Sequence, residues 1–276
     1  MSEDRVVVLT GATDGLGRAL AHRLAGRAGT LLILHGRNPS RLAAVESELA
    51  EHRARIVTVV ADLSEMVQVH HLADDITTVT DRVNVLVNNA GVGFGEPDGT
   101  DRRLTADGNE LRFAVNHLAP FALTRDLVPL LRAGAPARVV NVASIGQAEV
   151  DLDDPTLAHG YDGWQAYRRS KLAMIAAGFA LAEELPADQV TVNSVHPATF
   201  MPTKMVLHAG QEAEESLETG VASVMRLVDD PALEGVTGRF FNRQAEAQAR
   251  PAAYDPDYRG RLVRLSEELT RRGTRP

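Results

Sequence analysis

A tyrosine and a lysine four residues apart, Tyr167 and Lys171, are the side chains of this sequence best suited to chemistry. The other basic residues are 27 arginines and a single further lysine, Lys204. On a helix the pair lies on one face, so the ammonium is expected to lower the pKa of the phenol from about 10 toward the working pH. An ammonium also holds a phenol and a ribose together better than a guanidinium does. The pair indicates a proton-transferring tyrosine, although this spacing also occurs on ordinary solvated helices.

A glycine-rich turn follows the first apolar segment. Residues 5–10 predict a buried parallel strand and residues 18–27 an amphipathic helix, with Gly11, Gly15 and Gly17 between them. Glycines let the backbone turn tightly and approach a pyrophosphate, whose charge is stabilised by the N-terminus of a helix. The order of strand, turn and helix predicts a dinucleotide site, with a plain tight turn as the alternative.

Strand and helix patterns alternate along the rest of the chain. Further strands are expected at 31–34, 56–60, 83–87, 138–142, 190–195 and 238–241. Helices are expected at 39–51, 64–80, 104–131, 163–185, 212–228 and about 256–271, with loops at 91–99 and 147–163. This alternation predicts an α/β fold: a single-domain, Rossmann-like, doubly wound parallel sheet with helices on both faces.

Composition narrows the classes of function. A chain of 276 residues that is 44% hydrophobic can bury one large core. It has no apolar run of membrane-spanning length and no signal-peptide pattern, so we expect a cytoplasmic protein without a membrane partner. The absence of cysteine excludes disulfides and thiolate chemistry, and a net charge of −8 argues against nucleic acid as a partner. His70 and His71 are expected on the surface, and no metal site is predicted.

The order of the motifs resembles the short-chain dehydrogenase/reductase family over nearly the whole chain. Beyond the glycine turn and the Tyr167/Lys171 pair, the matching residues are Asp62-Leu63, Asn88-Asn89-Ala90-Gly91, Asn116, Ser144 and His196-Pro197-Ala198. The long connection between Ser144 and Tyr167, the segment 161–164 and the segment 235–241 resemble the retinol-dehydrogenase-like and protochlorophyllide-reductase-like branch.

The resemblance implies an oxidoreductase that transfers a hydride between a nicotinamide and a carbonyl or alcohol. Tyr167 would be the general acid and base, and Ser144 would hydrogen-bond the same oxygen. Lys171 would lower the pKa of the tyrosine and hold the nicotinamide ribose, while Asn116 would anchor a water relay. Two other classes stay open, namely non-redox chemistry such as epimerisation or dehydration, and an NADP-binding regulator without turnover.

The resemblance also implies the cofactor site. Its residues would be Gly11, Thr13, Asp14, Gly15, Leu16, Gly17, Arg37, Asp62, Leu63, Asn89, Ala90, Gly91, Tyr167, Lys171, Pro197 and Thr199. An acid near the end of the second strand would bind the ribose of NAD, but Gly36 and Arg37 stand there, and a guanidinium matches a 2′-phosphate. NADP is therefore expected over NAD. Asp14 departs from this pattern, because some NADP-dependent relatives carry a basic residue at its position.

Substrate contacts are expected from Ser144, Trp164, Met201 and Met205. The two methionines lie in a segment near 198–225 that resembles the mobile lid of the family, and they suit an adaptable apolar wall or a packed core edge. The substrate is thus expected to be an apolar small-molecule carbonyl or alcohol. A C-terminal helical extension is expected at 252–276, and a homodimer or homotetramer is possible.

Overall fold

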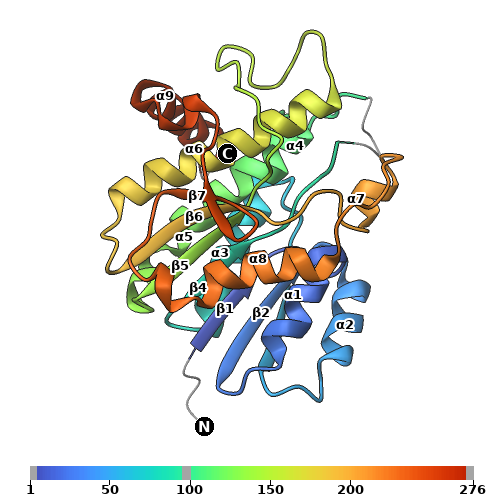
Figure 1. Cartoon of the computed structure of the whole chain (residues 1–276), viewed down its shortest axis with the longest axis vertical. Coiled ribbons are helices and arrows are strands. Elements are labelled where there is room, and N and C mark those ends of the chain that lie inside the picture. Colours follow the sequence, from blue (N-terminus) through green and yellow to red (C-terminus); the bar gives the residue numbers. More distant parts are fainter. Residues whose placement is uncertain (1–4, 95–100, 272–276) are drawn as a thin grey trace.

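The computed structural model describes residues 5–94 and 101–271, which form one α/β domain around a single sheet (Figure 1). The strand order is β3-β2-β1-β4-β5-β6-β7-β8. The strands are β1 (Arg5–Leu9), β2 (Thr30–Gly36), β3 (Arg55–Val60), β4 (Val85–Asn88), β5 (Ala137–Val142), β6 (Val190–His196), β7 (Arg239–Asn242) and β8 (Ala245–Ala247). Neighbouring strands pair in parallel except β7 and β8, which are antiparallel. The predicted doubly wound fold is confirmed.

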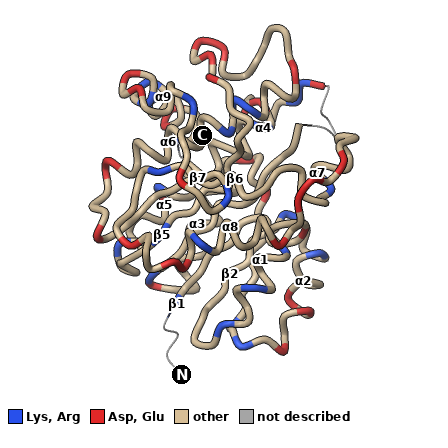
Figure 2. The backbone as a smooth tube through the Cα atoms, viewed as in Figure 1, with Lys and Arg blue, Asp and Glu red and all other residues tan. Residues whose placement is uncertain are grey.

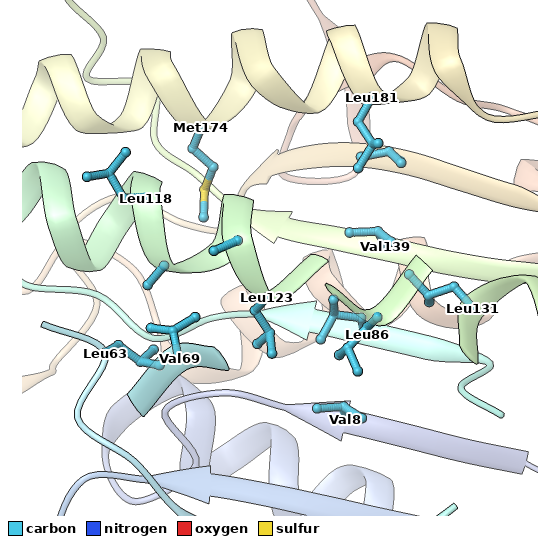
Figure 3. Close-up of a cluster of buried hydrophobic side chains, with 14 of the residues drawn as sticks. Val8, Leu63, Val69, Leu86, Leu118, Leu123, Leu131, Val139, Met174 and Leu181 are labelled. Atoms are coloured by element: carbon cyan, nitrogen blue, oxygen red, sulfur yellow. The ribbon is translucent and has the colours of Figure 1, made fainter. Parts of the chain in front are cut away.

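Helices cover both faces of the sheet. They are α1 (Gly15–Ala25), α2 (Pro39–Glu48), α3 (Met66–Val79), α4 (Leu111–Phe113), α5 (Ala119–Ala133), α6 (Gly163–Glu184), α7 (Lys204–Leu207), α8 (Leu217–Asp229) and α9 (Pro256–Leu269). Successive strand residues point to opposite faces. On β1, Val6 and Val8 pack with α3, α5 and α6, whereas Val7 and Leu9 pack with α1, α2 and α8. Figure 3 shows the first of these two cores, with Val8 below Leu123.

The helix predicted at 104–131 is shorter and interrupted. Residues 104–110 are irregular, and Glu110 caps α4 by accepting a hydrogen bond from the Phe113 N–H (2.8 Å). A π-helical turn, η1 (Ala114–Leu118), then separates α4 from α5. Such turns insert one extra residue into the helical ladder and are frequent at functional sites. Here the turn contains Asn116.

Three further elements differ from the sequence-based expectation. The helix predicted at 212–228 begins only at Leu217, because Ser216 caps it by accepting a hydrogen bond from the Thr219 N–H. The short helix α7 and the strand β8 were not predicted, since three or four residues carry too little periodicity to be recognised.

The prediction that His70 lies on the surface was wrong, whereas His71 is exposed as expected. The His70 Nδ1 lies 2.5 Å from Asp126 Oδ2 on α5, and its Nε2 lies 2.8 Å from the Thr270 carbonyl oxygen after α9. The imidazole is buried because the C-terminal helix folds back over this part of the molecule. Its neighbours therefore come from elements remote in sequence.

Charged residues of both signs are interspersed along the elements in the view of Figure 2. Within residues 5–94 and 101–271, no helix is both long enough and apolar enough to cross a membrane. Within the same residues, no group of three or more histidines and carboxylates is placed so that it could hold a metal ion.

Candidate active site

Tyr167 and Lys171 lie on the buried face of α6, whose first turn is capped by Asp162 accepting a hydrogen bond from the Gln165 N–H. The Lys171 Nζ donates to the Val142 carbonyl oxygen at the end of β5 (2.8 Å). It also lies 5.7 Å from the centroid of the Tyr167 ring. Helix α6 therefore brings the phenol and the ammonium to the carboxyl edge of the sheet, where doubly wound folds bind ligands.

The expected lowering of the Tyr167 pKa by Lys171 is not observed. Burial raises the pKa of Tyr167, and a hydrogen bond with Ser144 opposes that rise only in part. Burial lowers the pKa of Lys171 to about 8. The ammonium is bonded to a backbone carbonyl and not to the phenol, so desolvation dominates at both groups.

Ser144 follows β5 by two residues and is buried. Its Oγ accepts a hydrogen bond from the Gly146 N–H (3.0 Å), and its carbonyl oxygen accepts one from the Gln147 side chain (3.0 Å). These bonds fix the serine at the strand end, within hydrogen-bonding reach of the Tyr167 phenol.

Asn116 joins the π-helical turn to the segment after β4. Its amide exchanges hydrogen bonds with the backbone of Val92 (2.7 and 3.0 Å) and donates to Ser170 Oγ (3.0 Å). A Cβ at Gly91 would lie 3.2 Å from Asn116 Oδ1 and 3.6 Å from Lys171 Nζ. Asn116, Ser144, Tyr167 and Lys171, predicted from three separate motifs, thus lie close together: Asn116 and Lys171 flank Gly91, Tyr167 lies beside Lys171, and Ser144 hydrogen-bonds Tyr167.

The glycine turn lies beside these four residues and is shaped as a cradle. Gly11 has φ +70°, and a Cβ there would lie 2.8 Å from Ala90 Cα. A Cβ at Gly17 would lie 1.9 Å from the Gly11 carbonyl oxygen, so no other residue fits. The Asn89 side chain donates to the carbonyl oxygens of Thr10 (2.9 Å) and Gly11 (3.2 Å), which holds the turn against β4. This geometry fits a pyrophosphate at the N-terminus of α1.

His35 also shapes the turn, and sequence analysis missed it. Its Nδ1 accepts a hydrogen bond from the Gly11 N–H (3.3 Å), and its Nε2 lies 3.0 Å from the Ala61 carbonyl oxygen. These partners suit a neutral ring with the proton on Nε2, and burial lowers its pKa to about 4. A histidine at the end of the second strand, beside the glycine turn, was the available signal.

The residues predicted at the adenosine end lie around the end of β2. A Cβ at Gly36 would lie 2.6 Å from Thr13 Cγ2, so a larger residue there would have to displace the Thr13 side chain. The exposed Arg37 lies 3.8 Å from Asp62 (Nη1 to Oδ2), and Leu63 is buried in the core nearby.

Asp14 caps α1 and carries two cationic neighbours. It accepts a hydrogen bond from the Gly15 N–H (2.9 Å), while its Oδ2 lies 2.5 Å from Lys204 Nζ and 3.7 Å from Arg41 Nη1. Two positive side chains therefore compensate the acid that departs from the NADP pattern.

The predicted lid segment near 198–225 begins two residues after the end of β6. Its Thr199 is held on both sides, because the Thr199 N–H donates to Glu215 Oε2 (2.6 Å) and Thr199 Oγ1 accepts from Arg243 (3.3 Å). A Cβ at Gly93 would lie 2.3 Å from Met205 Cγ, which places Met205 beside the segment after β4.

Met201 lies elsewhere than Met205. A Cβ at Gly220 would lie 2.4 Å from Met201 Sδ and 3.2 Å from Leu16, so Met201 packs between α8 and α1. The structure thus places Met205 beside Gly93, in the segment after β4, and Met201 in the core around α8.

Aromatic rings lie beside Tyr167. The predicted Trp164 stacks on Phe94 with 3.7 Å between centroids and 18° between planes. Phe94 also meets Tyr167 edge to face at 5.3 Å and lies 6.2 Å from Phe200. Sequence analysis missed Phe94 and Phe200, whose only signal was their place in two loops at strand ends.

A glycine cradle, a strand-end serine and a tyrosine–lysine pair on one sheet edge define the class of nicotinamide-dinucleotide-binding oxidoreductases. The family model of the short chain dehydrogenases matches residues 5–214. The chain belongs to the short-chain dehydrogenase/reductase family, in its retinol-dehydrogenase-like branch, and is an NAD(P)-dependent oxidoreductase.

Three relatives illustrate the similarity. Polyprenol dehydrogenase of Mus musculus is 34% identical over 292 residues, which cover 98% of this chain and 84% of that protein. Retinol dehydrogenase 14 of Mus musculus is 31% identical over 293 residues (96% and 85%). The human WW domain-containing oxidoreductase is 32% identical over 287 residues (96% and 68%).

Solved structures share the fold. The RhlG/NADP active-site complex of Pseudomonas aeruginosa has a TM-score of 0.69 at 26% identity and covers 86% of this chain and 94% of that one. A short chain dehydrogenase of Shigella flexneri complexed with NADP has a TM-score of 0.65 at 26% identity (88% and 98%).

Proposed function

We propose that this chain is an NADP-dependent oxidoreductase that interconverts a carbonyl and an alcohol on an apolar small molecule. One observation carries the proposal: Asn116 and Lys171 flank Gly91 next to the glycine cradle, and Tyr167 lies beside Lys171 and hydrogen-bonds Ser144. When bound there, the nicotinamide dinucleotide supplies the hydride to the carbonyl carbon or accepts it from the alcohol.

The residues of the chain handle the proton. In the reducing direction Tyr167 donates a proton to the carbonyl oxygen, and Ser144 donates a hydrogen bond to the same oxygen. Burial raises the pKa of Tyr167 and therefore keeps the phenol protonated, as a donor must be. Lys171 and Asn116 orient the site and return a proton to the tyrosine after each turnover.

The preference for NADP over NAD rests on charge at the end of β2. Gly36 removes the acid that would bind a ribose hydroxyl, and Arg37 supplies a guanidinium for a 2′-phosphate. Lys204 and Arg41 compensate the charge of Asp14, so the acid in the turn repels that phosphate less. Two similar solved structures are described as complexes with NADP, which supports the same choice.

The preference for an apolar substrate rests on the side chains next to Tyr167. Phe94 contacts Tyr167, and around it lie Trp164, Phe200 and, beside Gly93, Met205. Apolar and aromatic side chains of this kind line sites for apolar ligands. Two relatives are named for polyprenol and for retinol, both apolar alcohols, which supports the same class for this chain.

Steady-state assays test the proposal. We would follow NADPH oxidation by its nicotinamide absorbance with a panel of ketones, aldehydes and quinones, and NADP reduction with alcohols, using Tyr167→Phe as the inactive control. Turnover that needs Tyr167 supports the proposal. Tight NADPH binding without turnover of any redox substrate would favour the non-catalytic regulator, and NADPH-dependent rearrangement without net redox change would favour an epimerase or dehydratase.

A further inference from the structure

A fully buried arginine, Arg112 of α4, bonds the segment that carries Phe94 and takes no part in the chemistry above. Its side chain is 0% exposed, and that of Glu110 is 1% exposed. An arginine is almost never buried to this extent unless its donors are paired, because desolvating the charge is costly. The contacts of Arg112 therefore indicate what the residue holds in place.

The planar guanidinium bonds two loops at once. Its Nε donates to the Gly93 carbonyl oxygen (2.7 Å), and its Nη1 donates to the Tyr161 hydroxyl (2.6 Å). Glu110 completes the cluster, since its Oε1 accepts from the Tyr161 hydroxyl (3.0 Å) and lies 3.4 Å from Arg112 Nη1. One side chain thereby fixes the segment after β4 relative to the segment before α6.

Each of these two segments leads directly to one ring of the stacked pair, Phe94 after β4 and Trp164 in the first turn of α6. Gly93 immediately precedes Phe94, and Tyr161 lies three residues before Trp164. The two rings stack at 3.7 Å, and the edge of Phe94 meets Tyr167 at 5.3 Å. Phe94 and Trp164 therefore form a flat apolar wall beside the catalytic phenol, and the distance between the loops sets the shape of that wall.

We propose that Arg112 is a specificity-determining positioning residue, which holds Phe94 and Trp164 in contact so that the site favours carbonyl substrates with a flat apolar group. The specificity part rests on the proposed function, whereas the positioning part does not. An arginine is suited to the role, since its fork reaches two acceptors in fixed directions and a lysine offers a single point charge.

Two substitutions separate positioning from folding. Tyr161→Phe removes only the hydroxyl that receives Arg112 and leaves the caps of α4 (Glu110 to Phe113 N) and α6 (Asp162 to Gln165 N) intact. Arg112→Lys keeps a positive charge beside Glu110 but cannot bond both loops. The matched control is Tyr254→Phe, which removes a hydroxyl bonded to the Ala249 N–H (3.0 Å), away from the wall.

The first measurement uses Trp164, the single tryptophan of the chain, as a reporter of the wall. In the unmodified protein Phe94 covers one face of the indole. Tyr161→Phe and Arg112→Lys should shift its emission and raise its quenching by acrylamide, whereas Tyr254→Phe should leave both unchanged. This measurement requires neither bound cofactor nor a substrate that is turned over.

The second measurement compares two probe substrates, 2-naphthaldehyde and butanal, with NADPH. Losing one aromatic contact should raise KM for 2-naphthaldehyde by about 3- to 10-fold in both variants. The kcat values, the KM for butanal and the dissociation constant of NADPH should stay within about 2-fold, because Tyr167, Ser144 and the glycine cradle are untouched.

The outcomes separate this inference from the proposed function. Unchanged quenching of Trp164 in folded Tyr161→Phe would overturn the positioning role, and so would an equal loss for both probes. If the unmodified protein turns over neither probe, the proposed function is in doubt, and binding of 2-naphthaldehyde to the NADP-loaded protein, followed by Trp164 emission, then decides the specificity claim. Equal affinity in Tyr161→Phe and the unmodified protein would overturn that claim.

Discussion

At the scale of single residues, desolvation governs the candidate active site. Tyr167 and Lys171 are both buried, and burial favours the neutral form of each. It raises the pKa of the phenol and lowers the pKa of the ammonium to about 8. A neutral phenol is the form that donates a proton to a carbonyl oxygen. The environment of the pair therefore suits reduction at neutral pH.

Replacing Tyr167 by Phe removes the proposed proton donor and keeps the ring that packs against Phe94. We expect kcat to fall by about 10²- to 10⁴-fold, the range typical of general acid–base catalysis, with NADPH binding unchanged. Steady-state kinetics and calorimetric titration with NADPH check this. Near-full activity in correctly folded Tyr167→Phe would show that the proton comes from another group.

Replacing Arg37 by Asp exchanges a phosphate-binding cation for a ribose-binding acid. NADPH should bind more tightly than NADH in the unmodified protein. Arg37→Asp should reverse this order, weakening the binding of NADPH and strengthening that of NADH by about 10-fold or more each. Isothermal titration calorimetry with both cofactors measures this. Equal affinities in the unmodified protein would refute the assignment of NADP.

At the scale of elements, the proposed lid is attached to the cofactor cradle at two points. Lys204 of α7 pairs with Asp14 at the N-terminus of α1. Gly15 meets the lid as well, since a Cβ there would lie 2.9 Å from Thr203 Cγ2. Both ion-pair partners are partly exposed, so the pair contributes about 1 kcal/mol or less and can break and re-form.

Hydrogen exchange tests the lid. Residues 199–210 should exchange faster than the strands in the free protein and become protected when NADPH and an apolar carbonyl are both present. Lys204→Met should speed exchange of these residues in the free protein by a few-fold, whereas Arg239→Met, which breaks a surface ion pair with Glu246, should not. Strong protection of the lid without ligand would instead indicate a packed core edge.

The sequence predicts those parts of the site in which a particular residue type is required at a fixed spacing. Gly11 and Gly17 are required by backbone contacts that no larger residue allows, so their spacing predicts the cradle. Phe94 could not be placed, because its position depends on Arg112 reaching across to Tyr161. The burial of His70 was equally hidden, since it depends on the end of α9.

At the scale of the whole molecule, three buried histidines couple stability to pH. Burial lowers the pKa of His35 to about 4, of His117 to about 3 and of His196 to about 4. In the unfolded chain each pKa returns to about 6.5. The unfolded state therefore binds more protons below pH 6.5, and stability is lost as the pH falls from about 6.5 to between about 4 and about 3.

The free energy of unfolding should accordingly be lower at pH 4.5 than at pH 7 by about 2 to 3 kcal/mol for each of the three histidines, on the basis of about 1.4 kcal/mol per pKa unit. Urea titrations followed by circular dichroism at a series of pH values measure it. His35→Asn, which keeps a short polar side chain beside Gly11, should reduce the slope. A free energy that stays constant from pH 7 to pH 4.5 would contradict the prediction.

The hairpin of β7 and β8 has a consequence for how copies of this protein meet. An open strand edge presents unpaired backbone groups that can recruit a strand from another molecule. Here β8 pairs with the edge of β7 that would otherwise be open. It is three residues long and carries Glu246, which forms an ion pair with Arg239 across the hairpin. A second copy therefore cannot extend the sheet through β7, and the strand edges left for such pairing are those of β3 and of the short, charged β8.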